Sequence, residues 1–242
     1  MLLILPFIFI ASFWGKVKGG NVIYAICKVW ADVWMFLVGI THRNIYEFPF
    51  DPHRQYIFIS NHISYLDVPI MMKIMRNQNF RILGKFEMAK IPLFGFIYKN
   101  AVVMVDRKSA VNRAESMKIL ASVIRKRISV FIFPEGTFNE TGKPLKLFFN
   151  GAFKIAIETG TPIVPVIILN SFDRLNYKSL LSLNPGISKA VFLKPFETLN
   201  LTIQDLPLLK EKIFIQMETA IIKYKAGWIN ESGCSLQTTK NL

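Results

Sequence analysis

The chain has 242 residues, of which 30 are Lys or Arg and 16 are Asp or Glu, giving a formal net charge of +14. Hydrophobic residues make up 52% of it, including 21 Phe and 4 Trp. Intrinsic disorder is excluded because disordered chains combine high net charge with low hydrophobicity. An ordinary water-soluble enzyme is disfavoured, since so basic a chain carries so many apolar residues. A phospholipid membrane accounts for both properties, because acyl chains accept apolar side chains and anionic headgroups attract Lys and Arg.

Nucleic acid is the other common partner for so large a positive charge. The chain contains no RNP motif, zinc-finger spacing or basic heptad region, so we expect no nucleic-acid partner. Its two cysteines, Cys27 and Cys234, lie far apart and form no CxxC pair. The sequence therefore predicts neither a disulfide framework nor a metal site.

Residues 1–45 predict a pair of membrane-associated helices. Residues 1–14 are almost wholly apolar but are fewer than the roughly 20 residues needed to span a bilayer. Residues 22–40 resume the apolar pattern but include Lys28 and Asp32, charges that are costly at the bilayer centre. A cleaved signal peptide and a buried core helix are the alternatives, although the first segment has no basic n-region and no small-residue cleavage site.

The basic residues around these helices predict their orientation. Lys16 and Lys18 lie in the connector and Arg43 follows the second helix. By the positive-inside rule, these residues lie on the cytoplasmic side. We therefore expect the protein at the cytoplasmic face of the inner (cell) membrane.

Beyond Pro49, short apolar runs alternate with amphipathic stretches. This pattern predicts a single α/β domain with a mixed, mostly parallel sheet flanked by helices. The expected strands are Gln55–Ser60, Arg81–Gly84, Ala101–Val105, Ile128–Phe133, Ile163–Leu169 and Ala190–Leu193. The expected helices are Leu66–Met75, Ala110–Arg125, Gly151–Glu158 and Leu206–Lys225, the last with Asp205 as N-cap and Gly227 as stop. The polar residues 230–242 predict a disordered tail.

His62 is the histidine best placed for chemistry, because it follows a predicted strand directly and Asp67 comes five positions later. His42 and His53 are better explained as solvated loop histidines. In a continuous α-helix, side chains at that spacing point roughly 140° apart, so His62 and Asp67 meet only if the chain bends. A strand-to-helix junction with Ser64 as helix N-cap allows the bend, and the pair would then form a general base for a hydroxyl. An N-cap Asp beside a loop histidine is the structural alternative.

A second motif, Phe133-Pro134-Glu135-Gly136-Thr137, leaves an apolar strand in a sharp turn. Its hydroxyl and exposed backbone N–H groups suit an anion. An ordinary strand-ending turn with a solvated Glu135 is the alternative.

Two cations, Lys85 and Arg107, end neighbouring predicted strands, at the edge where open α/β sheets bind ligands. Their charges suit a phosphate, and two surface ion pairs are the alternative. Further along, Pro162 lies at the start of an apolar run and Pro165 lies within it. This pattern predicts an edge strand or a special wall and not a central strand.

In this order the segments resemble the glycerolipid acyltransferase family, specifically the bacterial-type 1-acyl-sn-glycerol-3-phosphate (lysophosphatidic acid) acyltransferases. The resemblance covers roughly residues 55–170 and the N-terminal helices. Four blocks carry it: Asn61-His62 with Asp67, which form an HxxxxD motif; Gly84-Lys85 and Pro92 with Asp106-Arg107; Phe133-Pro134-Glu135-Gly136-Thr137; and Ile163-Val164-Pro165-Val166. It implies a glycerol-3-phosphate acyltransferase-like domain over residues 46–229.

The resemblance also implies an activity and roles for residues. A membrane-bound O-acyltransferase would move a fatty acyl group from acyl-CoA or acyl carrier protein to the sn-2 hydroxyl of the lysophospholipid 1-acylglycerol-3-phosphate, giving phosphatidic acid for phospholipid biosynthesis. His62 would remove the hydroxyl proton and Asp67 would orient the imidazole. No metal or prosthetic group is implied. The implied acceptor-binding residues are Lys85, Arg107, Glu135, Gly136 and Thr137, and a weaker acyl-donor or acyl-chain wall is Val164, Pro165 and Val166.

Phe138 and Phe149 depart from the family's pattern. Many members have Arg after the third block's Thr and Lys in a later FKxGA segment, so two expected cations are missing here. Lys143 or Lys146 would compensate for the loss. Otherwise the acceptor is a less charged lipid, such as another lysophospholipid or a lyso-aminolipid. A non-catalytic membrane-surface binding protein is the remaining alternative.

Overall fold

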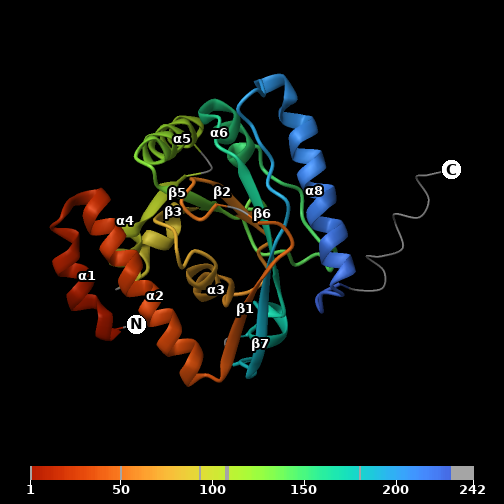
Figure 1. The fold of residues 1–242 in the computed structure, drawn as a ribbon. Helices are drawn as coiled ribbons and strands as arrows, with labels where there is room; N and C mark the ends of the chain where they lie inside the picture. Colours follow the sequence, from red (N-terminus) through yellow and green to blue (C-terminus); the bar gives the residue numbers. More distant parts are fainter. Residues whose placement is uncertain (1, 50, 93, 107–108, 180, 230–242) are drawn as a thin grey trace.

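The structure is a computed structural model that describes residues 2–49, 51–92, 94–106, 109–179 and 181–229. Within these ranges a single seven-stranded sheet carries helices on both faces (Figure 1). The expected tail, residues 230–242, lies outside the described residues, as does Arg107.

The sheet has the strand order β1-β7-β6-β2-β5-β3-β4. Strands β6 and β7 run antiparallel, whereas the other neighbouring strands run parallel. The prediction of a mixed, mostly parallel sheet is therefore confirmed. The strands are β1 (Ile40–Tyr46), β2 (Ile57–Ser60), β3 (Phe80–Lys85), β4 (Val102–Val105), β5 (Ser129–Ile132), β6 (Ile163–Leu169) and β7 (Gly186–Phe192).

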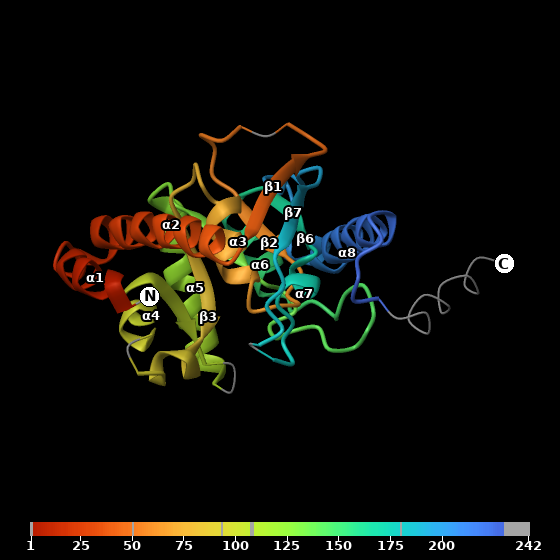
Figure 2. The same ribbon diagram turned by 90° about the horizontal axis from the view of Figure 1, so that it is seen from below.

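Helices α5, α6 and α8 pack on one face of the sheet, and α2 and α3 pack on the other. Figure 2 shows α1 and α4 beside α2 at one end of the molecule, with α8 at the opposite end. The helices are η1 (Leu2–Ile4), α1 (Leu5–Ser12), η2 (Gly15–Gly19), α2 (Gly20–Leu37), α3 (Asp67–Ile74), η3 (Phe86–Lys90), α4 (Phe94–Ala101), α5 (Ala110–Arg125), α6 (Gly151–Thr159), α7 (Ser171–Arg174), η4 (Ile203–Asp205) and α8 (Leu206–Lys223).

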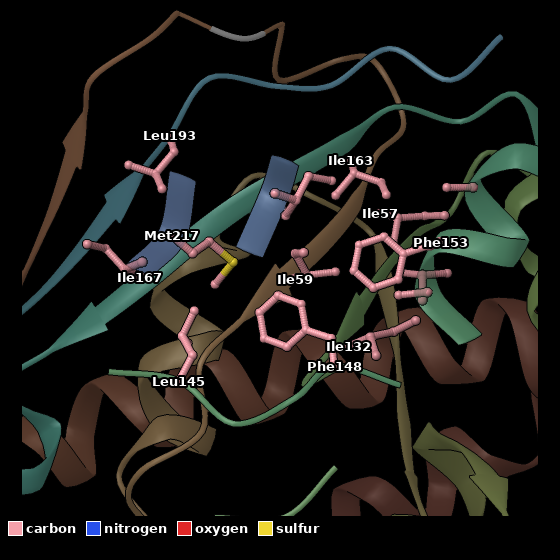
Figure 3. Packing of buried hydrophobic residues seen from close by; sticks show 14 of the residues in the cluster. Ile57, Ile59, Ile132, Leu145, Phe148, Phe153, Ile163, Ile167, Leu193 and Met217 are labelled. Atoms are coloured by element: carbon pink, nitrogen blue, oxygen red, sulfur yellow. The ribbon is translucent and has the colours of Figure 1, made fainter. Parts of the chain in front are cut away.

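Side chains of the central strands alternate between two apolar cores, as expected for a sheet covered on both faces. Ile57 and Ile59 of β2 join one core, where they lie with Phe153 of α6 and Met217 of α8 (Figure 3). Phe58, between them in sequence, joins the other core beneath α2 and α3. These two cores fix β2, and with it the position at which the chain leaves the sheet.

The six expected strands and four expected helices are all present, with ends shifted by a few residues. The expected caps differ in detail. Asp205 occupies the N-cap position of α8, but its carboxylate accepts a hydrogen bond from the backbone N–H of Thr202 (2.7 Å) instead of capping α8. That helix ends at Lys223, before Gly227.

Strand β1 is an edge strand that was not expected from the sequence, and most of it lies within the segment 1–45 expected to be helical. It pairs with β7 along its whole length. His42, expected in a solvated loop, lies in β1 and is half-buried, with ring nitrogens 2.9 Å from Ser188 Oγ and from Asn44 Oδ1. Burial lowers the pKa of His42 to about 4. Arg43 also lies in this strand and not at a helix exit.

Strand β6 is central, lying between β7 and β2, so the prediction of an edge strand is wrong. The proline is tolerated because no neighbour needs the N–H that it lacks. Two residues earlier, Ile163 points its N–H away from β2 and donates to Phe196 (2.9 Å). Pro165 therefore also turns its nitrogen away from β2, and the paired ladder with β7 begins only at the next residue, Val166. The carbonyl of Pro165 accepts the N–H of Leu193 (2.9 Å).

The N-terminal helical pair is present as α1 and α2, which pack against each other. The stretch Gly15–Leu37 is long and apolar enough to cross a membrane, by length and composition alone. Its charges turn toward the domain. The Lys28 ammonium donates to the carbonyls of Arg76 (3.0 Å) and Gln78 (2.9 Å), and the Asp32 carboxylate pairs with Lys73 and Arg76. Large apolar side chains remain exposed on these helices and on the turn that follows α1, among them Phe7, Phe13, Trp14, Phe36 and Leu37.

Candidate active site

The site begins at Asn61, where the chain leaves β2. Asn61 is buried, and its side-chain amide forms two hydrogen bonds with the backbone of Ile168 in β6. The Nδ2 group donates to the Ile168 carbonyl (3.0 Å), and Oδ1 accepts the Ile168 N–H (2.7 Å). This paired contact fixes the end of β2 against its neighbour at the residue before His62.

The chain bends between His62 and Asp67, as the sequence predicts, and the two side chains meet. Asp67 is fully buried, and its Oδ2 lies 2.9 Å from Nδ1 of His62. The same oxygen accepts the backbone N–H groups of Ile63 (2.7 Å) and Ser64 (2.9 Å), so the carboxylate stabilises the bend itself. Ser64 is not the helix N-cap: its hydroxyl accepts the N–H of Leu66, and α3 begins at Asp67.

The carboxylate determines which ring nitrogen of His62 carries the proton. A hydrogen bond to an acceptor-only carboxylate assigns the proton to Nδ1, which leaves the lone pair on Nε2. The other oxygen of Asp67, Oδ1, is buried and has no hydrogen-bond partner within the described part of the chain. The His62 side chain is 18% exposed, so its ring can be reached from outside. The pair is therefore arranged to accept a proton from a hydroxyl at Nε2.

Aromatic rings enclose the imidazole. The Phe133 ring stacks on it, with centroids 4.0 Å apart and planes 16° apart, and the Phe138 ring meets it edge-on at 4.4 Å. Tyr65 and Tyr177 extend this group through Phe138, at 5.0 and 6.1 Å. In the sequence, Phe138 is notable only because it stands where many family members have Arg. No sequence pattern reveals its contact with His62, because loop packing creates that contact.

Glu135 holds the backbone around the site. It is only 1% exposed, so the alternative of a solvated carboxylate is wrong. Its Oε1 accepts the backbone N–H of His62 (2.9 Å) and its Oε2 accepts that of Lys146 (2.8 Å). Burial raises the pKa of Glu135 to about 8, although both hydrogen bonds oppose this shift. This geometry makes Glu135 a positioning residue and gives no support to its predicted contact with the acceptor.

The turn after Glu135 presents a hydroxyl and a cation. Gly136 has a positive φ of 77°, and its N–H donates to the Phe133 carbonyl (3.0 Å), so that donor is engaged within the turn. Thr137 is exposed, and its Oγ1 lies 2.7 Å from the Lys146 ammonium. Lys146 thus brings a positive charge to the predicted acceptor-binding turn.

The other predicted residues within the described ranges lie in strands β3 and β6. Lys85 is exposed at the carboxyl end of β3, the sheet edge at which parallel strands β2 and β5 also end. Val164 and Val166 are fully buried beneath α2 and α3, and Pro165 is buried in β6 beside Ile59. Their contact with an acyl donor or acyl chain stays a prediction.

One cavity lies at the far end of α3, and a second borders the site. A cavity of about 650 Å³ is lined by Lys73 and Ile74, in the last turn of α3, and is thus at the opposite end of that helix from Asp67. A smaller cavity of about 170 Å³ borders the site, with Ile63 and Tyr177 among its lining residues. The larger cavity is not the place where the His62 base operates.

Comparison with known proteins identifies the class to which this fold and this pair belong. Residues 39–169, more than half of the chain, match the family model described as Acyltransferase. The chain belongs to this family and is an acyltransferase enzyme.

Individual relatives narrow the resemblance. The chain is 27% identical over 203 residues to the 1-acyl-sn-glycerol-3-phosphate acyltransferase alpha of Mus musculus, covering 83% of this chain and 70% of that protein. It is 34% identical over 146 residues to the 1-acyl-sn-glycerol-3-phosphate acyltransferase of Salmonella typhimurium, covering 58% and 56%. The predicted resemblance to these acyltransferases is confirmed.

A solved structure supports the fold. The crystal structure of the 1-acyl-sn-glycerophosphate (LPA) acyltransferase PlsC from Thermotoga maritima matches with a TM-score of 0.67 and 20% identity. The match covers 93% of this chain and 90% of that one. The predicted fold class is therefore confirmed.

Proposed function

We propose that this acyltransferase moves a fatty acyl group from the thioester of acyl-CoA or acyl carrier protein to the sn-2 hydroxyl of 1-acylglycerol-3-phosphate. The product is phosphatidic acid for phospholipid biosynthesis. The observation that carries the proposal is the 2.9 Å hydrogen bond between His62 Nδ1 and Asp67 Oδ2, which leaves Nε2 as the base. The names of the relatives supply the acceptor.

The reaction proceeds by direct attack of the acceptor. His62 Nε2 takes the proton of the sn-2 hydroxyl while the hydroxyl oxygen forms a bond to the thioester carbonyl carbon. The buried Asp67 carboxylate stabilises the imidazolium that forms. The tetrahedral intermediate then collapses, the carbon–sulfur bond breaks, and the thiolate takes the proton back from His62. An ester and a free thiol result, and the base is restored.

The surroundings of the pair favour this proton transfer. The rings of Phe133 and Phe138 cover two sides of the imidazole, and exclusion of water strengthens the attraction between imidazolium and carboxylate. Proton transfer and the reactive thioester suffice for the reaction, so the proposal includes no metal or prosthetic group.

We place the enzyme on the cytoplasmic face of the cell membrane, with α1 and α2 as its membrane-associated segment. Exposed apolar side chains on these helices, including Phe7 and Phe36, support a lipid partner. Lys16 and Lys18, in η2 between the helices, support the cytoplasmic side. The net charge of +14 adds attraction to anionic headgroups.

A second acceptor remains a candidate because of one observation. The Phe138 ring lies against His62 at the position where many relatives carry Arg, so the wall of the site there is apolar. A lysolipid with a less charged headgroup suits such a wall. A panel of lysolipids at a fixed acyl donor decides between the two acceptors, since preference for one without a terminal phosphate would replace the first proposal.

Substitution of the base tests the mechanism. In purified, folded protein, His62→Ala should abolish both thioester consumption and phosphatidic acid formation. Unchanged transfer to lysophosphatidic acid would refute the role of His62. A protein that merely binds membranes would consume no thioester with any acceptor, and this result in the unsubstituted protein would refute the proposed reaction.

A further inference from the structure

Lys146 is hydrogen-bonded to the turn that borders His62, through both its backbone and its side chain. Its backbone N–H donates to Glu135 Oε2 (2.8 Å), and its side-chain ammonium donates to Thr137 Oγ1 (2.7 Å). The side chain is thus tied to the same short turn as the backbone that carries it. An ammonium held in this way loses less freedom when it binds a ligand than a free surface lysine does.

Among the described residues, no ion pair neutralises the charge of Lys146, since none of their carboxylates lies within 4.0 Å of its ammonium. Thr137 takes one of its three N–H groups, and the Phe138 carbonyl lies at 3.5 Å, the outer limit of a hydrogen bond. At least one strong donor therefore remains for a ligand.

The turn that carries this cation is joined directly to the base. The backbone N–H of Asn139 donates to the His62 carbonyl (2.7 Å), and the Phe138 ring contacts the imidazole. A lipid whose hydroxyl reaches His62 thus lies against the segment to which the Lys146 ammonium is bound.

The neighbouring Lys143 differs from Lys146 in these respects. Its side chain is exposed, and its described contacts are made by the backbone. Its carbonyl accepts Asn139 Nδ2 (2.8 Å) and its N–H donates to Thr141 Oγ1 (3.2 Å). Lys143 is therefore a matched control in the same loop.

We propose that Lys146 selects the acceptor by its headgroup. Its ammonium, held in place by the hydrogen bond to Thr137, binds the phosphate monoester of the lysolipid. This assignment rests on the proposed function. It provides the cation that Phe138 and Phe149 do not supply. A lysine suits this task because its ammonium is a point charge with rotatable donors that can adjust to phosphate oxygens.

The test compares two acceptors that differ only in the headgroup. The full chain is assayed in phosphatidylcholine mixed micelles with 1-oleoylglycerol-3-phosphate or 1-oleoylglycerol, at a fixed concentration of the thioester that the unsubstituted protein uses. Lys146→Gln should lower kcat/KM for the phosphate acceptor about 10- to 100-fold, mainly through KM. Its activity with 1-oleoylglycerol should change less than about twofold, because that acceptor has no charge to lose.

Two further variants complete the design. Lys146→Arg should keep most of the phosphate preference, and Lys143→Gln should match the unsubstituted protein. If Lys146→Gln leaves the KM for the phosphate acceptor unchanged, the assignment is wrong. It is equally wrong if the variant loses kcat without a change in KM and Arg does not rescue it, since that pattern marks a structural role. Failure of the proposed function is separate: the unsubstituted protein would then not acylate 1-oleoylglycerol-3-phosphate.

Discussion

The imidazole of His62 lies flat on the ring of Phe133, with centroids 4.0 Å apart and planes 16° apart. The hydrogen bond from Nδ1 to Asp67 fixes one edge of the imidazole, but a single hydrogen bond still allows the ring to rotate about the axis of that bond. The stacked Phe133 removes that freedom. Two contacts of different kinds thus define the direction in which Nε2 points.

Replacement of Phe133 tests this positioning. Phe133→Leu keeps an apolar side chain but removes the stacked ring, so we expect kcat to fall about 3- to 10-fold, the range of a single aromatic contact. The KM for the acceptor should change little, because residue 133 lies against the imidazole and the Phe131 ring and is not one of the predicted acceptor-binding residues. Steady-state kinetics check this split, with a thermal melt to verify folding. An unchanged kcat would show that the hydrogen bond alone orients the ring.

Asp67→Asn separates the charge of this residue from its hydrogen bonds. The amide oxygen can still accept the N–H groups of Ile63 and Ser64, so the variant should fold. It cannot stabilise an imidazolium as a carboxylate does, and we expect kcat to fall about 10²- to 10⁴-fold. Measurement of kcat in purified protein checks this. A fall of less than about threefold would mean that Asp67 serves only to hold the bend.

Local rules in the sequence allowed His62 and Asp67 to meet but did not require it. Their spacing is wrong for one helix face, and the apolar run before Asn61 predicts a strand, so a strand-to-helix bend could bring them together. The resemblance of the four blocks favoured this pair over an N-cap Asp beside a loop histidine. The parallel sheet could be predicted from local rules, since strands buried on both faces are continuous apolar runs. Ile57–Ser60 and Ile163–Leu169 are such runs.

Features that depend on contacts between distant segments could not be predicted. The residues of β1 carry no clear alternation, and they form a strand only because β7 provides a partner. Pro165 suggests an edge strand until the pairing around it is known. The roles of Glu135 and Phe138 depend on how a loop folds back over His62, for which the sequence has no periodic signal.

Glu135 should make stability fall as the pH rises from about 5 to about 8. Its pKa is about 8 in the folded chain against 4.5 in the unfolded one, so the folded state holds this proton more tightly. The resulting stabilisation is complete below pH 4.5 and is lost as the pH rises through 8. Between pH 5 and pH 8, the free energy of unfolding of the unsubstituted protein should fall by about 3 kcal/mol relative to that of Glu135→Gln.

Urea unfolding of both proteins at each pH measures this effect. The difference between the two proteins removes the contributions of other titrating groups. Glutamine keeps one oxygen to accept an N–H from His62 or Lys146, so the variant should remain folded, with a constant loss of stability at low pH. A difference that does not change with pH would show that Glu135 titrates as in the unfolded chain.

His42 should produce the opposite dependence on the acid side. Burial lowers its pKa from 6.5 to about 4, so the unfolded state binds the proton more tightly. Stability is complete above pH 6.5 and is lost as the pH falls toward 4, by about 2 to 3 kcal/mol at the lower limit. His42→Gln, which retains groups to bond Ser188 and Asn44, should lack this loss. Urea unfolding at pH 7 and pH 4.5 checks it: equal acid sensitivity in both proteins would mean that β1 opens to water before His42 takes up its proton.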